Sequence, residues 1–577
     1  MLHKGSPRDK MIDMLVSNGF AELRRHKTTM RFIELFHNCF KGEMPYFAKR
    51  WFVSSVYKPV YDEARKIAEA RIHDADNMGE AINQSIMSMH TILSHILTER
   101  IQKKIEGLNE TGDWDSIFSD EFLSQFEIPS ELRSFFEKTR HSSRLNSPDI
   151  PDLLDGLSFP FLTSTLILAA YFTSTRVLYN ARPLLTEFSE KINQFKQPKR
   201  ALWLTDTFED HNGVSIVLQS FYKEIVERDL PIDIMVCSNK LKSDDHLVVL
   251  KPVAEFDLPV YQEQPIRVPN FLEVHKKFHD GEYDRIICST EGVMGLVSLF
   301  LKNAYHVPAH FYIHTDWITF GKKVLKLKKN NLNRLRRILR AFYHNFDSLF
   351  VLNTDQHKWL TNRKMGFKDD DVHLTAHWVE EDFIPHDSSK EEQFDLAENE
   401  PVLLFTGRVS HEKGVMELPS ILTKARQEIP DLKLVVAGTG PAEEELRKAI
   451  PDATYLGWVD HKQLPQIYAA ADLLILPSKF DTFSCVVLES FSCGLPVIAY
   501  NTKGPKDIIQ HGKNGYLANS KTEIANSIIE YFSDNSTRKS FKKAAKKRAG
   551  HYAVDQILSK FLHDIDLEQP ISEYEPA

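Results

Sequence analysis

Residues 401–414, PVLLFTGRVSHEKG, join a short apolar run to a glycine and two cations. Further short apolar runs follow along the chain in LKLVVAG, ATYLG, DLLILP and PVIAY, each of which ends at Gly, Pro or polar residues. Amphipathic stretches of helical length separate these runs, and that alternation predicts a parallel sheet with helices on both faces. Ligands of such sheets bind beyond the carboxyl ends of the strands, which is where Arg408 and Lys413 stand.

A similar alternation comes earlier in the chain. From Arg200 the runs ALWLT, IDIMVC, RIICST, AHFYIH and SLFVLN alternate with helical stretches, whereas the preceding residues show helical periodicity only. We therefore predict an α/β fold with two facing, doubly wound Rossmann-like domains behind a mostly helical domain of unassigned role. The predicted parts are a helical domain at 1–193, Rossmann-like domains at 200–385 and 396–550, and a C-terminal tail at 551–577.

Composition narrows the class of protein. Hydrophobic residues make up 42% and charged residues 26%, which are ordinary values for a folded globular chain. The formal net charge of -8 gives no overall attraction to nucleic acid. The five cysteines are scattered and form no metal-ligand pattern, so we expect reduced thiols. No apolar run follows the first charged residues, and we expect a cytoplasmic protein without a secretory signal.

A polar turn follows the first strand-like run. ALWLT leads into residues 206–213, DTFEDHNG, in which Asn-Gly permits a tight turn before a helix. The N-terminus of that helix would offer backbone N–H groups to an anion. An ordinary strand-to-helix loop would have much the same residues, so both interpretations stay open for this turn alone.

Cations and glycines follow the strands of the second predicted domain. Arg408 and Lys413 would suit a diphosphate, because they neutralise charge that grows on a leaving phosphate. Two solvated surface cations are the alternative. Gly438 and Gly440, in LVVAGTGP, would allow a close backbone approach to a ligand or would simply form a turn.

Two carboxylates are spaced eight residues apart in the same domain. Asp481 is predicted to stand at a helix start and Glu489 about two turns further on. Each carboxylate could accept hydrogen bonds from sugar or ribose hydroxyls. The alternative is an N-capping aspartate followed by an unrelated glutamate.

Together these motifs resemble glycosyltransferase family 4, the retaining glycosyltransferases of the GT-B fold. Arg408-x4-Lys413, Gly-Thr-Gly-Pro, Leu456-Gly-Trp and Asp481-x7-Glu489 followed by Cys-Gly-Leu-Pro-Val agree in order and spacing. The segments Thr-Asp-Thr-Phe and Phe-Tyr-Ile-His-Thr-Asp resemble the lipid-sugar branch, which includes sulfoquinovosyl- and mannosyl-transferases. The resemblance covers residues 200–550 and implies transfer of a hexose from a nucleoside-diphosphate sugar to an acceptor hydroxyl, without a metal or other cofactor.

The resemblance also implies residue roles. His314, in the His-Thr-Asp turn, would face the donor sugar near its reacting carbon, and Asp481 stands where the family usually has a glutamate that touches the sugar. Arg408 and Lys413 would bind the phosphates and take the place of a cation. The implied donor-binding residues are Gly213, Arg408, Lys413, Gly438, Gly440, Leu456, Asp481, Phe483, Ser484 and Glu489.

Two segments depart from the family pattern. Residues 481–484 read Asp-Thr-Phe-Ser where the family commonly has Glu-Gly-Phe-Gly, which shortens the carboxylate by one methylene and removes two glycines. Residues 374–379, LTAHWV, replace the usual Pro-Asn-Gly-Val. These changes leave a catalytically silent scaffold as one alternative function.

Two other segments bear on the acceptor. Residues 322–340, KKVLKLKKNNLNRLRRILR, contain nine basic and no acidic residues. Apolar residues recur at helical spacing from Leu332 to Phe342, which predicts a basic amphipathic helix. Such a helix suits an anionic membrane surface and a lipid acceptor, although a solvated helix packed on its own domain, with a soluble sugar acceptor, is the alternative. The uncharged residues 157–175 are predicted to form a buried or membrane-surface helix, with a membrane span as the alternative.

Overall fold

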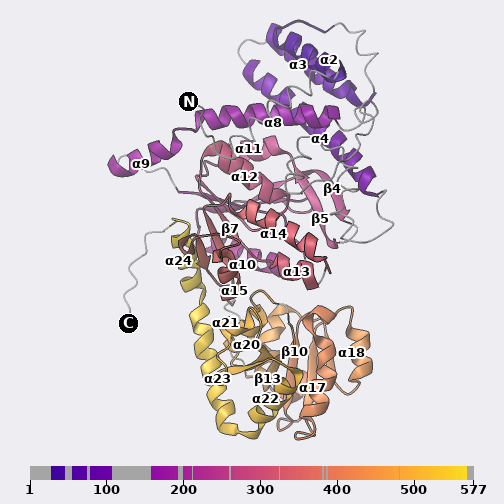
Figure 1. Ribbon diagram of the computed structural model, residues 1–577, viewed down its shortest axis with the longest axis vertical. Coiled ribbons are helices and arrows are strands. Elements are labelled where there is room, and N and C mark those ends of the chain that lie inside the picture. The colour runs from indigo at the N-terminus through magenta and orange to yellow at the C-terminus, as the bar shows by residue number, and fades with distance from the viewer. Residues whose placement is uncertain are drawn as a thin grey trace. The chain divides into compact units, whose positions relative to one another are not determined.

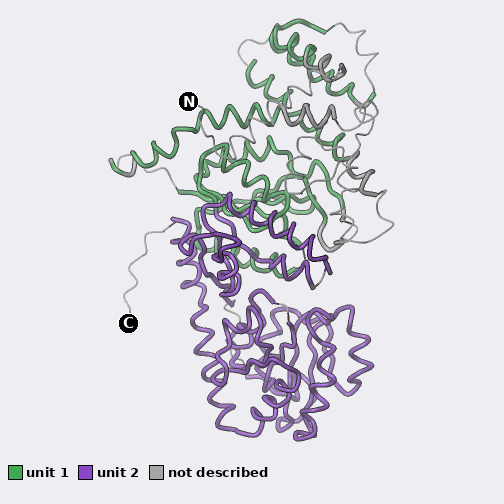
Figure 2. Tube along the Cα trace, in the orientation of Figure 1, with its two compact units in different colours: residues 1–309 green, residues 310–577 purple. Residues whose placement is uncertain are grey.

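The computed structural model places most of the chain in two compact units, residues 1–309 and 310–577 (Figure 2). Each unit is described by itself. The structure describes residues 27–45, 55–73, 78–106, 158–192, 199–210, 212–258, 261–323, 325–379, 383–384, 387–479 and 481–567.

The first unit begins with helices, as the sequence predicted. Helices α3 and α4 pack through buried apolar side chains such as Val60, Ile67 and Leu93, which recur at helical spacing. The helices of this part are α2 (Lys27–Phe40), α3 (Lys58–His73), α4 (Met78–Glu106), α8 (Ser158–Leu178) and α9 (Arg182–Ile192).

Helix α8 forms from the uncharged stretch 157–175. On one of its faces the ring of Phe172 packs 5.4 Å from that of Phe300, and Thr175 Oγ1 lies 2.8 Å from His275 Nε2. Among the described residues, no helix combines the length and the apolar character that crossing a membrane requires. The stretch is thus a helix with one packed face, and its contact with a membrane surface stays a prediction.

A parallel sheet follows in the order β3-β2-β1-β6-β7-β8-β9. Strand β1 pairs in parallel with β2 on one side and with β6 on the other, so the strand order reverses beside β1. Ligand sites of such sheets lie at that reversal. The strands are β1 (Ala201–Thr205), β2 (Ile232–Cys237), β3 (Leu247–Leu250), β6 (Arg285–Cys288), β7 (Ala309–Tyr312), β8 (Ser348–Val351) and β9 (Val372–Leu374).

Strands β1, β2, β3 and β6 lie in the first unit, whereas β8 and β9 lie in the second; the remaining described elements of the first unit are a hairpin and three helices. Strands β4 and β5 form an antiparallel hairpin, with Glu255 opposite Arg267. The elements are β4 (Pro252–Leu258), β5 (Tyr261–Pro269), α10 (Gly213–Glu227), α11 (Phe271–Asp280) and α12 (Val293–Tyr305) (Figure 1).

The second unit holds a six-stranded parallel sheet in the order β12-β11-β10-β13-β14-β15. Strand β10 lies between β11 and β13, so here too the order reverses beside the first strand. All five residues of β10 are buried, which fits a strand covered by helices on both faces. The strands are β10 (Val402–Thr406), β11 (Lys433–Ala437), β12 (Thr454–Gly457), β13 (Leu473–Leu476), β14 (Val497–Tyr500) and β15 (Gly515–Ala518).

Helices flank this sheet in Figure 1. Part of the stretch expected to be a C-terminal tail forms helix α24 (Val554–Asp564), and its Phe561 ring packs 4.9 Å from that of Phe350. The helices around the second sheet are α17 (Leu418–Ala425), α18 (Glu443–Ala449), α19 (Leu464–Ala470), α20 (Cys485–Ser492), α21 (Pro505–Ile508), α22 (Lys521–Ser533) and α23 (Asn535–Ala549), with α16 (Lys390–Phe394) before β10.

The predicted basic amphipathic helix forms as α14 over residues 329–340 of the stretch 322–340, but residues 325–328 of the same stretch are not helical. Helix α13 (Trp317–Lys323) ends before α14 (Lys329–Tyr343) begins, and α15 (Thr354–Thr361) follows β8. Between the two helices Lys326 adopts a positive φ of 51° and the side chain of Leu327 is buried. The chain breaks because burying this leucine redirects the backbone, and helical spacing alone does not reveal that.

Candidate active site

The turn after β1 is tied to the N-terminus of α12. The Asp206 carboxylate accepts hydrogen bonds from Thr290 Oγ1 at 2.6 Å and from the Met294 backbone N–H at 3.0 Å. Burial raises the pKa of Asp206. A Cβ atom at Gly292 would lie 2.6 Å from Asp206 Oδ2, so a larger residue there would displace this carboxylate. The sequence assigned no role to either residue.

Gly213 is the first residue of α10, as the turn predicted. The side-chain oxygen of Asn212 accepts from the backbone N–H groups of Val214 at 3.0 Å and Ser215 at 2.9 Å. Two of the amides that a helix N-terminus could offer an anion are therefore held by the capping residue. The Gly213 amide is not one of these two, and a Cβ at Gly213 would meet nothing within 4 Å.

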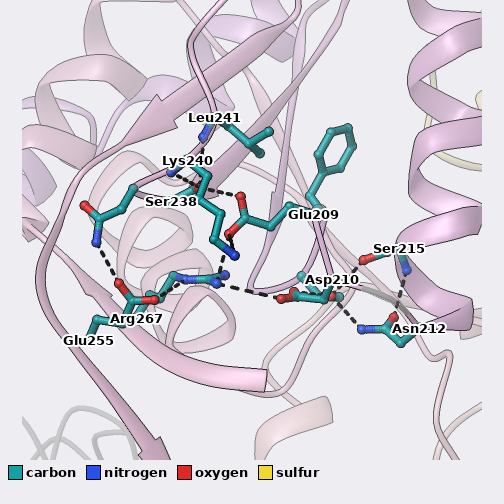
Figure 3. A network of polar contacts seen from close by, with 12 residues as sticks. Glu209, Asp210, Asn212, Ser215, Ser238, Lys240, Leu241, Glu255 and Arg267 are labelled. Atoms are coloured by element: carbon teal, nitrogen blue, oxygen red, sulfur yellow. Dashed lines mark hydrogen bonds and ion pairs between the residues drawn. The ribbon is translucent and has the colours of Figure 1, made fainter. Parts of the chain in front are cut away.

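Arg267, on β5 of the β4–β5 hairpin, forms ion pairs with residues of the same turn (Figure 3). Its guanidinium lies 2.9 Å from Glu209 and 3.7 Å from Asp210 in the turn, and 3.1 Å from Glu255 across the hairpin. Only 5% of the Arg267 side chain is exposed. Glu209 also accepts from Ser238 Oγ at 2.7 Å. Arg267 thus offsets part of a buried negative charge next to α10, and nothing in the local sequence reveals this contact.

His314 follows β7 and is buried. Its ring stacks on that of Tyr312 at 4.3 Å and on that of His377 at 5.7 Å. Burial lowers the pKa of His314 to about 3, and His314 Nε2 has no hydrogen-bond partner. The residue therefore presents a neutral imidazole rather than a cation. His377 belongs to the stretch 374–379, which departs from the family pattern, and the sequence assigned it no role.

Gly438 and Gly440 support the loop that carries Arg408. A Cβ atom at Gly438 would lie 2.0 Å from the Gly407 carbonyl oxygen, and one at Gly440 would lie 2.3 Å from the Val409 carbonyl oxygen. These two glycines thus allow their own backbone to lie close to the backbone of the loop that carries Arg408. This approach places Arg408, an exposed residue, directly past the end of β10.

Lys413 and Asp481 meet at the same edge of the sheet. Lys413 Nζ lies 3.4 Å from Asp481 Oδ2, and both side chains are partly exposed. Gly414 makes the turn behind Lys413 with φ 75°, and a Cβ there would lie 2.1 Å from the Pro477 carbonyl oxygen. The structure therefore brings the predicted cation and the predicted carboxylate together.

Asp481 precedes the helix rather than starting it, which corrects the prediction of a helix start at this residue. Helix α20 begins at Cys485, and its N-cap is Ser484 with φ 78° and no side-chain capping bond. Ser484 thus keeps a left-handed backbone at a position where the family pattern has glycine, and that turn delays the helix. The Ser484 side chain is buried and its Oγ has no hydrogen-bond partner.

The remaining donor-site candidates lie around this loop and on neighbouring elements. The Phe483 ring packs edge-on against that of His377 at 4.8 Å, so the loop after β13 contacts the His314 stack. Asn353 Nδ2 donates to the Thr482 carbonyl oxygen at 2.8 Å and fixes the same loop. Leu456 is half-buried on β12, at the end of which Gly457 adopts φ 70°.

Glu489 is held by a tyrosine that the sequence did not single out. Tyr468 OH donates to Glu489 Oε2 at 2.8 Å and lies 3.1 Å from Thr406 Oγ1 at the end of β10. The side chain of Glu489 is 15% exposed. One oxygen of the Glu489 carboxylate is therefore held in place beside the end of β10, the strand that Arg408 follows.

Two family models match the chain. The model described as glycosyl transferases group 1 covers residues 387–548, and the model described as glycosyltransferase family 4 covers residues 211–383. Together they cover most of both α/β regions and every donor-site residue that the sequence proposed.

Curated relatives match over part of their length. A sulfoquinovosyl transferase of Arabidopsis thaliana is 32% identical over 182 residues, 30% of this chain and 35% of that protein. An alpha-monoglucosyldiacylglycerol synthase of Streptococcus pneumoniae is 23% identical over 326 residues, 52% of this chain and 73% of that protein. In the first of these relatives the match thus spans about a third of the protein's length.

Solved structures share the fold. The sucrose-phosphate synthase of Thermosynechococcus elongatus aligns with a TM-score of 0.54 at 18% identity, over 63% of this chain and 98% of that one. HepE of Anabaena, solved in complex with UDP, aligns with a TM-score of 0.52 at 19% identity, over 64% and 99%.

Proposed function

The chain belongs to the group 1 and family 4 glycosyltransferases of the GT-B fold, and from this premise we propose that it moves a hexose from a nucleoside-diphosphate sugar to a hydroxyl of a membrane lipid, with retention of configuration. The observation that carries the proposal is the Lys413–Asp481 ion pair, which lies past the ends of β10 and β13. Arg408 follows the same strand β10, and Tyr468 holds Glu489 beside Thr406 at its end.

The donor would lie at this edge with its diphosphate against the two cations. Lys413 would then exchange Asp481 for a phosphate oxygen, and the released carboxylate would accept a hydrogen bond from a sugar hydroxyl. Glu489, oriented by Tyr468, would accept from the ribose hydroxyls. Gly213, to which the resemblance also assigns a phosphate contact, begins α10 in the first unit.

Bond breaking places negative charge on the departing diphosphate, and Arg408 with Lys413 would stabilise it without a metal ion. The acceptor hydroxyl would attack from the face that the diphosphate leaves, and a phosphate oxygen would take its proton. His314, kept neutral by burial, would offer its unpartnered Nε2 to a sugar hydroxyl near the reacting carbon. Closure of the site would exclude water, which would otherwise hydrolyse the donor.

Two observations support a lipid acceptor, namely the exposed basic residues around α14 and the name of one relative. Lys328, Lys329, Arg337 and Arg340 are exposed on and beside α14, which suits an anionic membrane surface and a peripheral location on its cytoplasmic face. One relative is named for a diacylglycerol glycolipid. A soluble sugar acceptor and a silent scaffold are the alternatives that the experiment separates.

The test measures hydrolysis of UDP-, GDP- and ADP-sugars by the purified full chain, with and without anionic lipid vesicles. We expect turnover of one donor, stimulation by vesicles, and loss of turnover in Arg408→Ala and Lys413→Ala. Lys448→Ala, on the exposed face of α18, is the matched control. Turnover that ignores vesicles would favour a soluble acceptor, and absence of both binding and turnover for every donor would favour the scaffold.

A further inference from the structure

Helix α23 carries a row of lysines along one side. Seven of its 15 residues are basic and none is acidic. Lys539, Lys543 and Lys547 recur every fourth residue, which places them on one face of the helix, and Lys546 follows Lys543 by three residues on the same side. All four side chains are exposed. We call these four residues the lysine face.

The opposite side of α23 packs on its own domain. Phe541, Ala545 and Ala549, again four residues apart, are buried, and the Phe541 ring lies 5.1 Å from that of Tyr516. All 15 residues of α23 are described, and every exposed one among them is polar. The helix therefore has no exposed apolar side chain to insert into a bilayer, and the lysine face can act only through charge.

The charge of the lysine face is not balanced locally. Asp534, the acidic residue nearest in sequence, caps the helix and accepts from Ser536 and Thr537. Lysines four residues apart repel one another and destabilise a helix. The helix dipole favours cations in the last turn, but Lys539 and Lys543 stand earlier in the helix, where it gives them no support. A negatively charged partner would remove this repulsion.

The use of lysine rather than arginine on this face distinguishes between partners. Arg548 of the same helix turns toward the protein, where its guanidinium donates to the backbone oxygens of Ile508 at 3.0 Å and Asp507 at 2.8 Å. An arginine fork suits phosphates at fixed positions, whereas a lysine ammonium is a mobile point charge. Single-stranded nucleic acid is bound with exposed aromatic rings, and the described residues of α23 expose none. Point charges spread over about 12 Å of helix instead fit a fluid anionic surface.

We propose that the lysine face binds the anionic surface of a membrane by charge alone. The inference rests on the proposed function, which places the acceptor in that membrane, and adds a contact to the one proposed for α14. Helix α14 stands between β7 and β8 of the first sheet, whereas α23 packs beside α20 and α22 of the second α/β region. Each α/β region then has its own contact with the membrane, and the region proposed to bind the donor is held at the surface that contains the acceptor.

The test measures binding of the purified full chain to vesicles of phosphatidylcholine alone and to vesicles that also contain phosphatidylglycerol. The lysine-face variant is Lys539→Gln/Lys543→Gln/Lys547→Gln. Lys546 stays, because its side chain lies against Gly494 and supports the packing there. The remaining exposed lysine also keeps the helix soluble in water.

The control variant removes the same charge elsewhere in the same unit. It changes three exposed lysines outside α23, namely Lys462→Gln/Lys513→Gln/Lys521→Gln. Any effect of net charge alone is therefore the same in both triple variants.

We expect the unmutated chain to bind only the anionic vesicles, and more weakly at about 1 M than at about 0.1 M salt, because salt screens the charges. The lysine-face variant should bind about 100-fold more weakly, since each basic residue near an anionic surface contributes about 5-fold. The control should lose less than about 3-fold, because charges away from the contact are screened.

Three outcomes would overturn the proposal. One is equal vesicle binding by the two triple variants, and another is binding that disappears only in Lys328→Gln/Lys329→Gln, which would leave α14 as the contact. The third is binding of a single-stranded RNA of mixed sequence, lost in the lysine-face variant, without binding of vesicles, which would assign the face to nucleic acid.

The two proposals fail separately, because donor hydrolysis without vesicles tests the transferase. Donor turnover together with equal vesicle binding by both triple variants refutes only the lysine face. Vesicle binding that the lysine-face variant loses, without turnover of any donor, refutes only the transferase.

Discussion

The imidazole rings of His314 and His377 stack with their centroids 5.7 Å apart and their planes 10° from parallel. Both side chains are buried, and burial lowers the pKa of each, to about 3 for His314 and well below the ordinary value for His377. The stretch 374–379, which departs from the family pattern, thus supplies a ring that fixes the orientation of a proposed catalytic histidine.

Removal of this ring should impair catalysis more than binding. An aromatic pair contributes about 0.5–1.5 kcal/mol, so we expect His377→Ala to lower kcat by about 2- to 12-fold. His377→Phe keeps a stacking ring and should retain most of the rate. Steady-state kinetics with the preferred donor measure both variants. Equal losses in the two would show that stacking is not the function of His377.

Burial of His314 as a neutral ring predicts an acid-sensitive fold. The folded pKa of about 3 lies below the unfolded value of about 6.5, so between these values the unfolded chain binds more protons and stability falls as pH falls. His314 alone should contribute a slope of up to about 1.4 kcal/mol per pH unit below pH 6. Urea unfolding of the full chain between pH 4.5 and 7 should show a shallower slope in His314→Gln. Identical slopes of stability against pH in the unmutated chain and in His314→Gln would mean that the folded protein carries a protonated His314 over this pH range.

The Lys413–Asp481 pair should compete with the donor diphosphate. A partly exposed ion pair contributes about 0.2–1 kcal/mol, so Asp481→Asn should tighten binding of the nucleoside diphosphate product about 1.4- to 5-fold. The same variant should slow sugar transfer, because an amide is a weaker acceptor for a sugar hydroxyl than a carboxylate. Calorimetric titration and kinetics separate the two effects. Weaker product binding would contradict this account.

Loss of Arg267 should destabilise the first unit and weaken the turn before α10. Arg267→Met would leave Asp210 buried without its cation and Glu209 with only Lys240, at 3.9 Å, at a cost of about 3–5 kcal/mol. We expect a lower midpoint of urea unfolding and a higher KM for the donor. Arg447→Met, at an exposed helical ion pair, provides the comparison and should change the midpoint little. An unshifted midpoint in Arg267→Met would show that the network adds no stability.

Ser484 holds a left-handed backbone that costs an ordinary residue about 1–2 kcal/mol. Ser484→Gly should therefore raise the free energy of unfolding by about 0.5–1 kcal/mol, because glycine's larger unfolded-state entropy cancels part of the relief. Thermal unfolding measures the gain. A destabilised variant would indicate that the buried Ser484 hydroxyl makes a contact that outweighs the strain.

The sequence by itself determined the features that depend on local pattern. Alternating apolar runs predicted two parallel α/β sheets, and turn residues at strand ends, such as Gly213 and Arg408, marked where each sheet could bind a ligand. The prediction of two parallel sheets is confirmed, because a buried parallel strand and the turn after it are set by neighbouring residues, whereas the ligand sites at those turns stay predictions. The order of the motifs was enough to indicate the family.

Only the tertiary structure decided which distant residues support that site. Arg267 on β5, Tyr468 on α19 and His377 in the loop after β9 reach their partners from other parts of the chain. No spacing rule connects them to Asp210, Glu489 or His314. The non-helical residues 325–328 of the basic stretch and the late start of α20 have the same origin. A buried Leu327 and a left-handed Ser484 override helical periodicity, since packing and backbone geometry outweigh the small free energies of local propensity.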